Sequence, residues 1–429
     1  MKTIIQSVKG ARDFYPREMS ILTWIYNTAR EVSESFGYQE FDGPFLETIE
    51  LYAAKSGEEL VKEQSFVFSD RGGNLITLRP ELTPTLVRMV AKQQRQLTYP
   101  LRWWSFGPFW RYERPQKGRS REFFQWNIDL IGVDSPEGDA ELAAIIAAFF
   151  KKIGLSPEQV TILINNRRLM DQELNKLMIT EADHQSIFQL IDRRAKMDLE
   201  DWGKYAIEIG LNSHQVDGLN NLLSNQELWK NSTELVRFFS TIESLGFSEY
   251  VFYAPHVIRG LDYYTGTVFE AQDRRGVVKR SILGGGRYDN LMQDVGGDPL
   301  PGVGFAMGDM VISLLLEKYN LIPDGIGRSP AEVLVTVFGD KQINTSFSMA
   351  AELRRSGIKT NCYPESAKLG KQFKFAARID VDFVIVLGPD EIANNLVTIK
   401  HLKSGDQKTI ARSEVESYIL QTLDGDESS

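Results

Sequence analysis

The sequence has a single cysteine, Cys362, among its 429 residues. One cysteine cannot form an internal disulfide or a multi-cysteine zinc or iron–sulfur centre, which excludes a disulfide-built secreted protein. Long apolar runs are also lacking: the longest extends from Leu142 to Phe150, whereas a membrane span needs about 18 residues or more. The first residues contain no apolar segment of signal-peptide length. These absences predict a cytoplasmic protein without a membrane span.

An excess of basic charge is missing as well. The net charge is −9, from 49 Lys and Arg against 58 Asp and Glu. This balance argues against nonspecific nucleic-acid binding over the whole surface, although it leaves room for a local basic face. The composition, 42% hydrophobic and 25% charged, is that of an ordinary globular protein, and the length predicts two or three domains.

The pattern along the chain predicts three regions. Residues 1–325 combine helices and strands around an antiparallel core, so we expect an α+β domain whose antiparallel sheet is flanked by helices. Within it, residues 168–245 are mostly helical and polar and form a predicted insertion. A Pro- and Gly-rich linker, Pro323 to Pro330, precedes residues 330–429. There, short apolar strands alternate with helices, which predicts a compact α/β domain with a mixed or parallel sheet.

One expected strand, FFQWNIDLIG (123–132), carries polar residues on one face and apolar residues on the other. Side chains alternate along a strand, so Gln125, Asn127 and Asp129 share a face. A solvated sheet face would explain this pattern. The loop before the strand favours a site that a polyphosphate could enter, because it gathers four cations: Arg114, Lys117, Arg119 and Arg121.

Two further segments suggest chemistry. In RGLDYYTGTVFE (259–270), an arginine suited to a carboxylate or phosphate precedes two tyrosines, which could equally be core residues. In LGGGRYDNL, the run Gly284–Gly286 is not followed by GK[ST] and does not fit GxGxxG. Close backbone packing and a nucleotide lying over the strand both remain possible there. The four histidines are scattered and show no metal-ligand spacing.

Six segments, in order, resemble the class II histidyl-tRNA synthetases: FGYQEFDGPFLE, LRPELT, RYERPQKGRSREFFQWNIDLIG, RGLDYYTGTVFE, GGGRYD and GVGFAMG. Residues 330–429 resemble the anticodon-binding domain of that family. The resemblance covers essentially the whole chain. It implies an ATP-dependent ligase that joins L-histidine to tRNA(His) through a histidyl-adenylate. It also implies a homodimer, and Mg²⁺ that binds with ATP rather than at a metal site of the protein.

The resemblance also implies roles for individual residues. Those for histidine are Glu81, Thr83 and Gln125 at the α-ammonium, Asp129 and Tyr264 at the imidazole, and the catalytic Arg111 and Arg259 at the carboxylate and α-phosphate, with Tyr263 as a further histidine-binding residue. Those for ATP are Glu113 near adenine, Phe123 stacked under it, Arg119 at the γ-phosphate and Gly308 in the third motif. For tRNA, Gln116 and Arg121 come from the charged loop. Lys368, Lys371, Lys374 and Arg378 follow at helical spacing, a pattern that a solvated helix face would also show.

The third motif departs from the class II pattern. The family usually has an arginine that meets the γ-phosphate, but here the run is GFAMGDMVISLL, with Met310 and Val311 at the expected place. A lost charge-assisted bond requires compensation. Arg119 and Arg259 are the two candidates that motif logic supplies.

Two rival functions are open to test. The regulatory subunit of ATP phosphoribosyltransferase shares the catalytic fold but only binds histidine. We expect such a protein to degrade RGLDYY and to lack the anticodon-binding domain, and both are intact here. Other class II synthetases with a similar C-terminal domain, such as the prolyl, threonyl and glycyl enzymes, lack RGLDYYTG. The histidine–tRNA ligase is therefore the favoured function.

Overall fold

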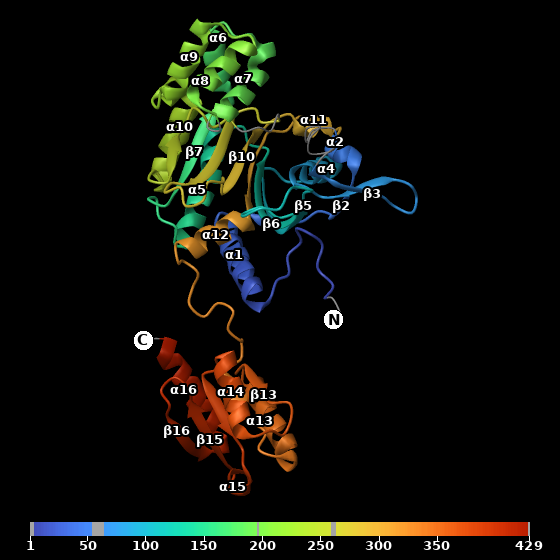
Figure 1. Cartoon of the computed structure of the whole chain (residues 1–429), viewed down its shortest axis with the longest axis vertical. Helices are drawn as coiled ribbons and strands as arrows, with labels where there is room; N and C mark the ends of the chain where they lie inside the picture. Colours follow the sequence, from blue (N-terminus) through green and yellow to red (C-terminus); the bar gives the residue numbers. More distant parts are fainter. Residues whose placement is uncertain (1–3, 54–63, 195–196, 259–262, 428–429) are drawn as a thin grey trace. The chain divides into compact units, whose positions relative to one another are not determined.

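The computed structural model describes residues 4–53, 64–194, 197–258 and 263–427 (Figure 1). The chain divides into two compact units, Met1–Pro323 and Asp324–Ser429, so the division falls at the start of the Pro- and Gly-rich segment. No helix of the described residues is long and apolar enough to cross a membrane.

The first unit is built on a sheet to which the described residues contribute eight strands. Their order is β1 (Gln39–Glu40), β5 (Leu101–Trp110), β6 (Glu122–Ile131), β11 (Gly302–Gly308), β10 (Leu283–Tyr288), β9 (Thr267–Asp273), β7 (Val160–Asn166) and β8 (Val251–Tyr253). The central pairs are antiparallel, including the expected hairpin of β5 and β6. The predicted antiparallel sheet flanked by helices is thus confirmed, with parallel pairs only at β1–β5 and β7–β8.

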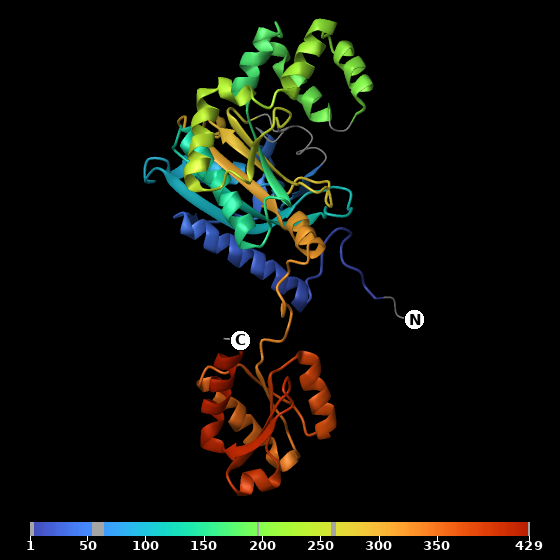
Figure 2. The same ribbon diagram turned by 90° about the vertical axis from the view of Figure 1, so that its left-hand side faces the viewer.

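Two helices, α1 (Pro16–Ser35) and α5 (Pro136–Lys152), pack on one face of this sheet (Figure 2). They cover the apolar side of β6: the Trp126 ring lies 5.0 Å from Phe149, and its indole N–H donates to Ser33 Oγ at 3.2 Å. Helix α5 begins three residues before the expected Asp139, because Ser135 caps its first turn and Pro136 fits the first helical position. Helix α12 (Asp309–Lys318) follows β11.

Other helices pack on the opposite face of the sheet. There α4 (Thr83–Gln93) and α11 (Leu291–Asp294) form an apolar cluster with Leu101, Ile131 and Tyr288. A small sheet of β2 (Leu46–Thr48), β4 (Leu75–Leu78) and β3 (Phe66–Ser69), with α2 (Ile49–Ala53), precedes α4. The polar residues Gln125, Asn127 and Asp129 of β6 face this side, away from α1 and α5, and Asn127 and Asp129 are buried there.

The helical segment after β7 contains α6 (Arg167–Lys176), α7 (Glu181–Arg193), α8 (Leu199–Glu208), α9 (Ser213–Ser224), the 3₁₀ helix η3 (Leu228–Asn231) and α10 (Thr233–Leu245). Helices α6 to α9 gather into one group beyond the end of β7 (Figure 1). Helix α10 instead packs on α5, where Arg237 and Glu137 form an ion pair at 2.8 Å.

The second unit has a sheet to which its described residues give five strands in the order β13 (Thr360–Cys362), β12 (Val333–Val335), β14 (Phe383–Val386), β15 (Leu396–His401) and β16 (Gln407–Ala411). The first three are parallel and the last two antiparallel, so the sheet is mixed. Its helices are α13 (Ile343–Arg355), α14 (Leu369–Ile379), α15 (Pro389–Ala393) and α16 (Val415–Glu427), with 3₁₀ turns η4 (Asp340–Gln342) and η5 (Arg412–Glu414). The α/β pattern was expected, although β16 was not.

Candidate active site

The candidate site lies on the polar face of the large sheet, and small residues form its floor. Strand β11 places Gly304, Ala306 and Gly308 directly beside Asp129, Asn127 and Gln125 of β6. On the next strand, Gly286 and Gly284 pair with Gly304 and Ala306. A side chain on these strands would fill the space between β6 and β9. The glycines therefore leave this part of the sheet surface without side chains, so that a ligand could lie directly on the strands.

Asp129 and Tyr264 each lie against one of two paired glycines of this floor, Gly304 and Gly286. A Cβ on Gly304 would overlap the Asp129 carboxylate, and one on Gly286 would lie 2.8 Å from the Tyr264 ring. The Tyr288 hydroxyl donates to Asp129 Oδ1 at 2.5 Å. Because Asp129 is only 4% exposed, burial raises the pKa of its carboxyl to about 7. The site thus holds an acidic group poised between its two protonation states at neutral pH.

The LRPELT segment brings Glu81 and Thr83 to the same place. Glu81 is buried, and Thr83 begins helix α4. The rings of Tyr263 and Tyr264 are 4.9 Å apart. Burial raises the pKa of Tyr263, and the neighbouring Tyr264 and Glu81 raise it further, which places Glu81 close to the tyrosine pair. The acceptors Glu81 and Thr83, at the start of α4, thus lie near the hydroxyls of the two tyrosines.

Arg111, at the end of β5, is fixed between the LRPELT segment and β6. Its Nε donates to the carbonyl oxygen of Pro80 at 2.9 Å, and its guanidinium lies 5.5 Å from the centre of the Phe123 ring. Gln125 follows on the same strand face, and its Oε1 is buried without a hydrogen-bond partner among the described residues. A guanidinium and an unsatisfied acceptor therefore lie beside the glycine floor. A zwitterionic ligand requires both, the cation for its carboxylate and the acceptor for its ammonium group.

The charged loop between β5 and β6 is organised by internal pairs. Arg119 forms an ion pair with Glu113 at 2.8 Å, so these two predicted nucleotide contacts lie together. The guanidinium of Arg121 lies 4.0 Å from the centre of the Tyr112 ring. Gln116 is exposed. Gly308 ends β11 with open space around it, and the remaining predicted catalytic residue, Arg259, lies outside the described residues.

Two residues that the sequence did not single out hold the base of this loop. Asp309 is buried; one carboxylate oxygen pairs with Arg12 at 2.8 Å, and the other accepts from the Phe124 N–H at 2.8 Å. The backbone of Gly10 adds a second attachment, because its carbonyl oxygen accepts hydrogen bonds from Ser120 and Arg121. The acidic residue in GFAMGD is the one local signal for this contact.

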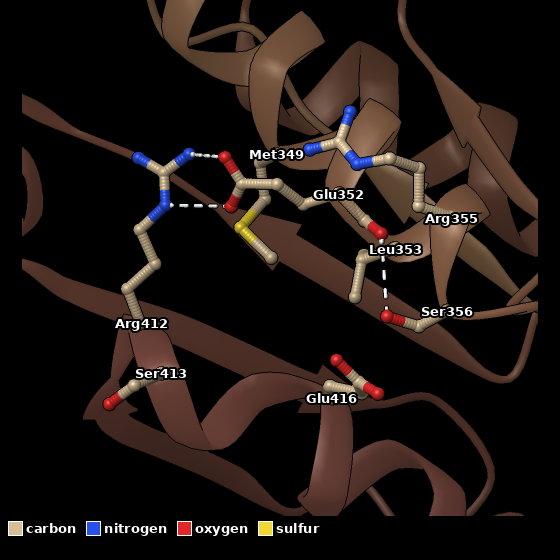
Figure 3. A pocket seen from close by; sticks show the side chains of 8 residues that line it. All are labelled: Met349, Glu352, Leu353, Arg355, Ser356, Arg412, Ser413 and Glu416. Atoms are coloured by element: carbon tan, nitrogen blue, oxygen red, sulfur yellow. Dashed lines mark hydrogen bonds and ion pairs between the residues drawn. The ribbon is translucent and has the colours of Figure 1, made fainter.

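The predicted basic residues of the second unit lie on an exposed face of α14. Lys368, Lys371, Lys374 and Arg378 are all exposed, whereas Gln372 and Ala376 of the same helix are buried. A cavity of about 330 Å³ elsewhere in this unit also contains arginine (Figure 3). There Arg412 is neutralised by Glu352 at 2.7 and 3.1 Å. On the α14 face, Lys371 pairs with Glu365 at 3.1 Å, but Lys368, Lys374 and Arg378 form no ion pair with any residue in the described ranges, so this face is the better candidate of the two for a polyanion.

No group of three or more His, Cys, Asp or Glu side chains is placed to hold a metal ion in the part of the chain that the structure describes.

Comparisons with known proteins identify the family of this chain. Residues 10–310 match the histidyl-tRNA synthetase family, and residues 332–422 match the anticodon-binding domain family. A chloroplastic/mitochondrial histidine–tRNA ligase of Arabidopsis thaliana is 36% identical over 97% of this chain and 87% of its own length. The histidine–tRNA ligase of Leptospira biflexa is 33% identical over 98% of this chain and 99% of its own.

A solved histidyl-tRNA synthetase from Nostoc sp. PCC 7120 has a TM-score of 0.82 at 25% identity, covering 98% of this chain and all of the other. The family predicted from the sequence motifs is thus confirmed over nearly the full length. This chain belongs to the histidyl-tRNA synthetase family.

Proposed function

We propose that this chain is a histidine–tRNA ligase, which activates L-histidine with ATP and transfers the histidyl group to tRNA(His). The observation that carries the proposal is the buried acidic group, Asp129, set beside Tyr264 over a glycine floor, with Arg111 at the open end of the same strand pair. Membership of the synthetase family supports the same reaction.

Histidine recognition follows from the inventory of donors and acceptors. Neutral imidazole has one N–H donor and one acceptor nitrogen, which suit the Asp129 carboxylate and the Tyr264 hydroxyl. An α-ammonium has only donors, and Glu81, Thr83 and the unpaired Oε1 of Gln125 offer acceptors. The carboxylate of the amino acid would then lie at Arg111.

The activation step is in-line attack of the histidine carboxylate on the α-phosphorus of ATP, with pyrophosphate as the leaving group. Catalysis of such a step is mainly positioning and charge stabilisation. Arg111 would hold the reacting carboxylate and the α-phosphate, and Arg259 would have the same role by family resemblance. Phe123 would stack under adenine, near Glu113 and Gly308, with ATP bound as its Mg²⁺ complex. A ribose hydroxyl of the tRNA then attacks the mixed anhydride and releases AMP.

The proposal assigns residues 1–325 to catalysis, with 168–245 inserted, and residues 330–429 to the anticodon. The match of residues 332–422 to the anticodon-binding family and the exposed cations of α14 support tRNA binding by the second unit. Gln116 and Arg121 are further tRNA contacts in the proposal. We also propose that the protein is a homodimer and is located in the cytoplasm.

Pyrophosphate exchange with each of the twenty amino acids tests this function. We expect exchange with histidine alone, and its loss in Arg111→Ala, whose circular dichroism should match that of the wild type. Exchange with another amino acid would assign the chain to a different class II specificity. Histidine binding without any exchange would favour the alternative function, a noncatalytic regulatory subunit of ATP phosphoribosyltransferase.

A further inference from the structure

The start of helix α12 carries a valine where the sequence comparison expects an arginine for the triphosphate. Val311 lies in the first turn of this helix and is only 8% exposed. A valine side chain offers no charge to a phosphate. If ATP binds on the glycine floor, its outer phosphates need a cation from another part of the chain.

Arg280 lies close to Val311 and to the charged loop. It stands in the connection between β9 and β10, and its side chain runs along the charged loop: a Cβ on Gly118 would be 3.4 Å from Arg280 Cδ and 3.9 Å from its Nε. The same point is 3.9 Å from Val311 Cγ2. Three segments distant in sequence thus meet here, and the guanidinium side chain lies beside the valine.

The charge of Arg280 is not neutralised within the protein. Arg280 is half-buried and forms no hydrogen bond or ion pair with any residue in the described ranges. Neighbouring arginines differ in this respect, since Arg119 is paired with Glu113 and Arg12 with Asp309. A partly desolvated guanidinium without a carboxylate is suited to bind an external anion through its fork of N–H donors.

Arg280 also faces open space on the side of the sheet that carries the glycine floor. It lines a cavity of about 820 Å³ together with Glu270 and Ser281. Glu270 pairs with Gly284 across β9 and β10, and Gly284 pairs with Ala306, so the cavity wall and the glycine floor share one face of the sheet. The carboxylate of Glu270 accepts hydrogen bonds from Gln272 and Ser281 at 2.6 and 2.7 Å.

We propose that Arg280 binds the β- or γ-phosphate of ATP and supplies the guanidinium that the third motif of this chain lacks. The proposal rests on the proposed function, because it assumes that ATP lies on the glycine floor. It adds a nucleotide-binding residue to Arg119 and Arg259, and it differs from the sequence-based expectation that those two residues suffice.

The test compares the binding of ATP and AMP, which differ in the phosphates that Arg280 would contact. Arg280→Ala should weaken ATP binding in calorimetry by roughly 10- to 100-fold, the usual effect of a lost charge-assisted bond, while AMP binding stays unchanged. Arg275→Ala is the matched control: it removes an exposed arginine of the same connection and should change neither affinity. ATP affinity that persists in Arg280→Ala, or an equal loss for AMP, would overturn the proposal.

Kinetics separate this proposal from the proposed function. In histidine-dependent pyrophosphate exchange, Arg280→Ala should raise the KM for ATP at least tenfold with little change in the KM for histidine. Adding Val311→Arg to Arg280→Ala should recover part of the ATP affinity, since it places a guanidinium on the neighbouring helix. Absence of exchange in the wild type would reject the proposed function, whereas wild-type exchange with an unaltered KM for ATP in the variant would reject only the role of Arg280.

Discussion

Replacing Asp129 by asparagine should stabilise the protein at alkaline pH while impairing histidine recognition. The carboxyl is 4% exposed, and burial raises its pKa from 3.8 to about 7. Between these two values the folded state binds more protons than the unfolded state, so this group lowers the free energy of unfolding as pH rises. Above pH 7 both states are ionised and the cost becomes constant. Asparagine removes the charge but keeps an oxygen that can accept from Tyr288.

The magnitude follows from the difference in pKa. About three units at 1.36 kcal/mol each give roughly 4 kcal/mol of destabilisation by the ionised carboxylate at pH 8.5, and about half of that at pH 5.5. Asp129→Asn should therefore be more stable than the wild type by up to roughly 4 kcal/mol at pH 8.5, with the gain smaller by about 2 kcal/mol at pH 5.5. At the same time the KM for histidine should rise at least tenfold, because the variant loses the charged acceptor for imidazole. Stability and function would thus change in opposite directions.

Urea unfolding followed by tryptophan fluorescence measures this effect in the full chain. All seven tryptophans lie between Trp24 and Trp229, so the signal reports on the first unit. Asp139→Asn is a control of opposite sign: this carboxylate is also buried, but Arg287 binds it at 2.6 Å, and removing it should destabilise the protein by roughly 3–5 kcal/mol. A loss of stability in Asp129→Asn at pH 8.5, or a gain that does not vary with pH, would refute the reasoning.

Three other outcomes are expected. Arg12→Ala should lower the free energy of unfolding by roughly 2 kcal/mol because it leaves Asp309 buried and unpaired. Adding Asp309→Asn should recover part of this loss, and urea titrations in which the effects of the two substitutions simply add would contradict the reasoning. Lys374→Glu with Arg378→Glu should weaken tRNA binding in filter assays and leave amino-acid activation intact. The control Lys408→Glu, at an exposed strand residue, should change neither tRNA binding nor activation. Burial raises the pKa of Cys362 to about 11, so iodoacetamide should modify it slowly at pH 8 until urea is added.

Local patterns determined much of the architecture. Alternation along residues 123–132 predicted the two faces of β6, and the spacing of Lys368, Lys371, Lys374 and Arg378 predicted the exposed face of α14. These features depend on residues within a few positions of one another, where backbone periodicity alone decides which side chains share a face. The ends of elements were less predictable, because caps such as Ser135 extend a helix beyond its apolar repeat.

The sequence by itself determined the fold class, the family and the residue types of the site. Only the tertiary structure decided which groups meet: Tyr288 binds Asp129 across 159 positions, Arg12 binds Asp309 across 297, and Arg280 lies beside Gly118 and Val311. Alternation defines two faces of a strand but not the one that α1 and α5 cover. That choice, and with it the pKa of Asp129, depends on burial by distant segments, which no local pattern encodes.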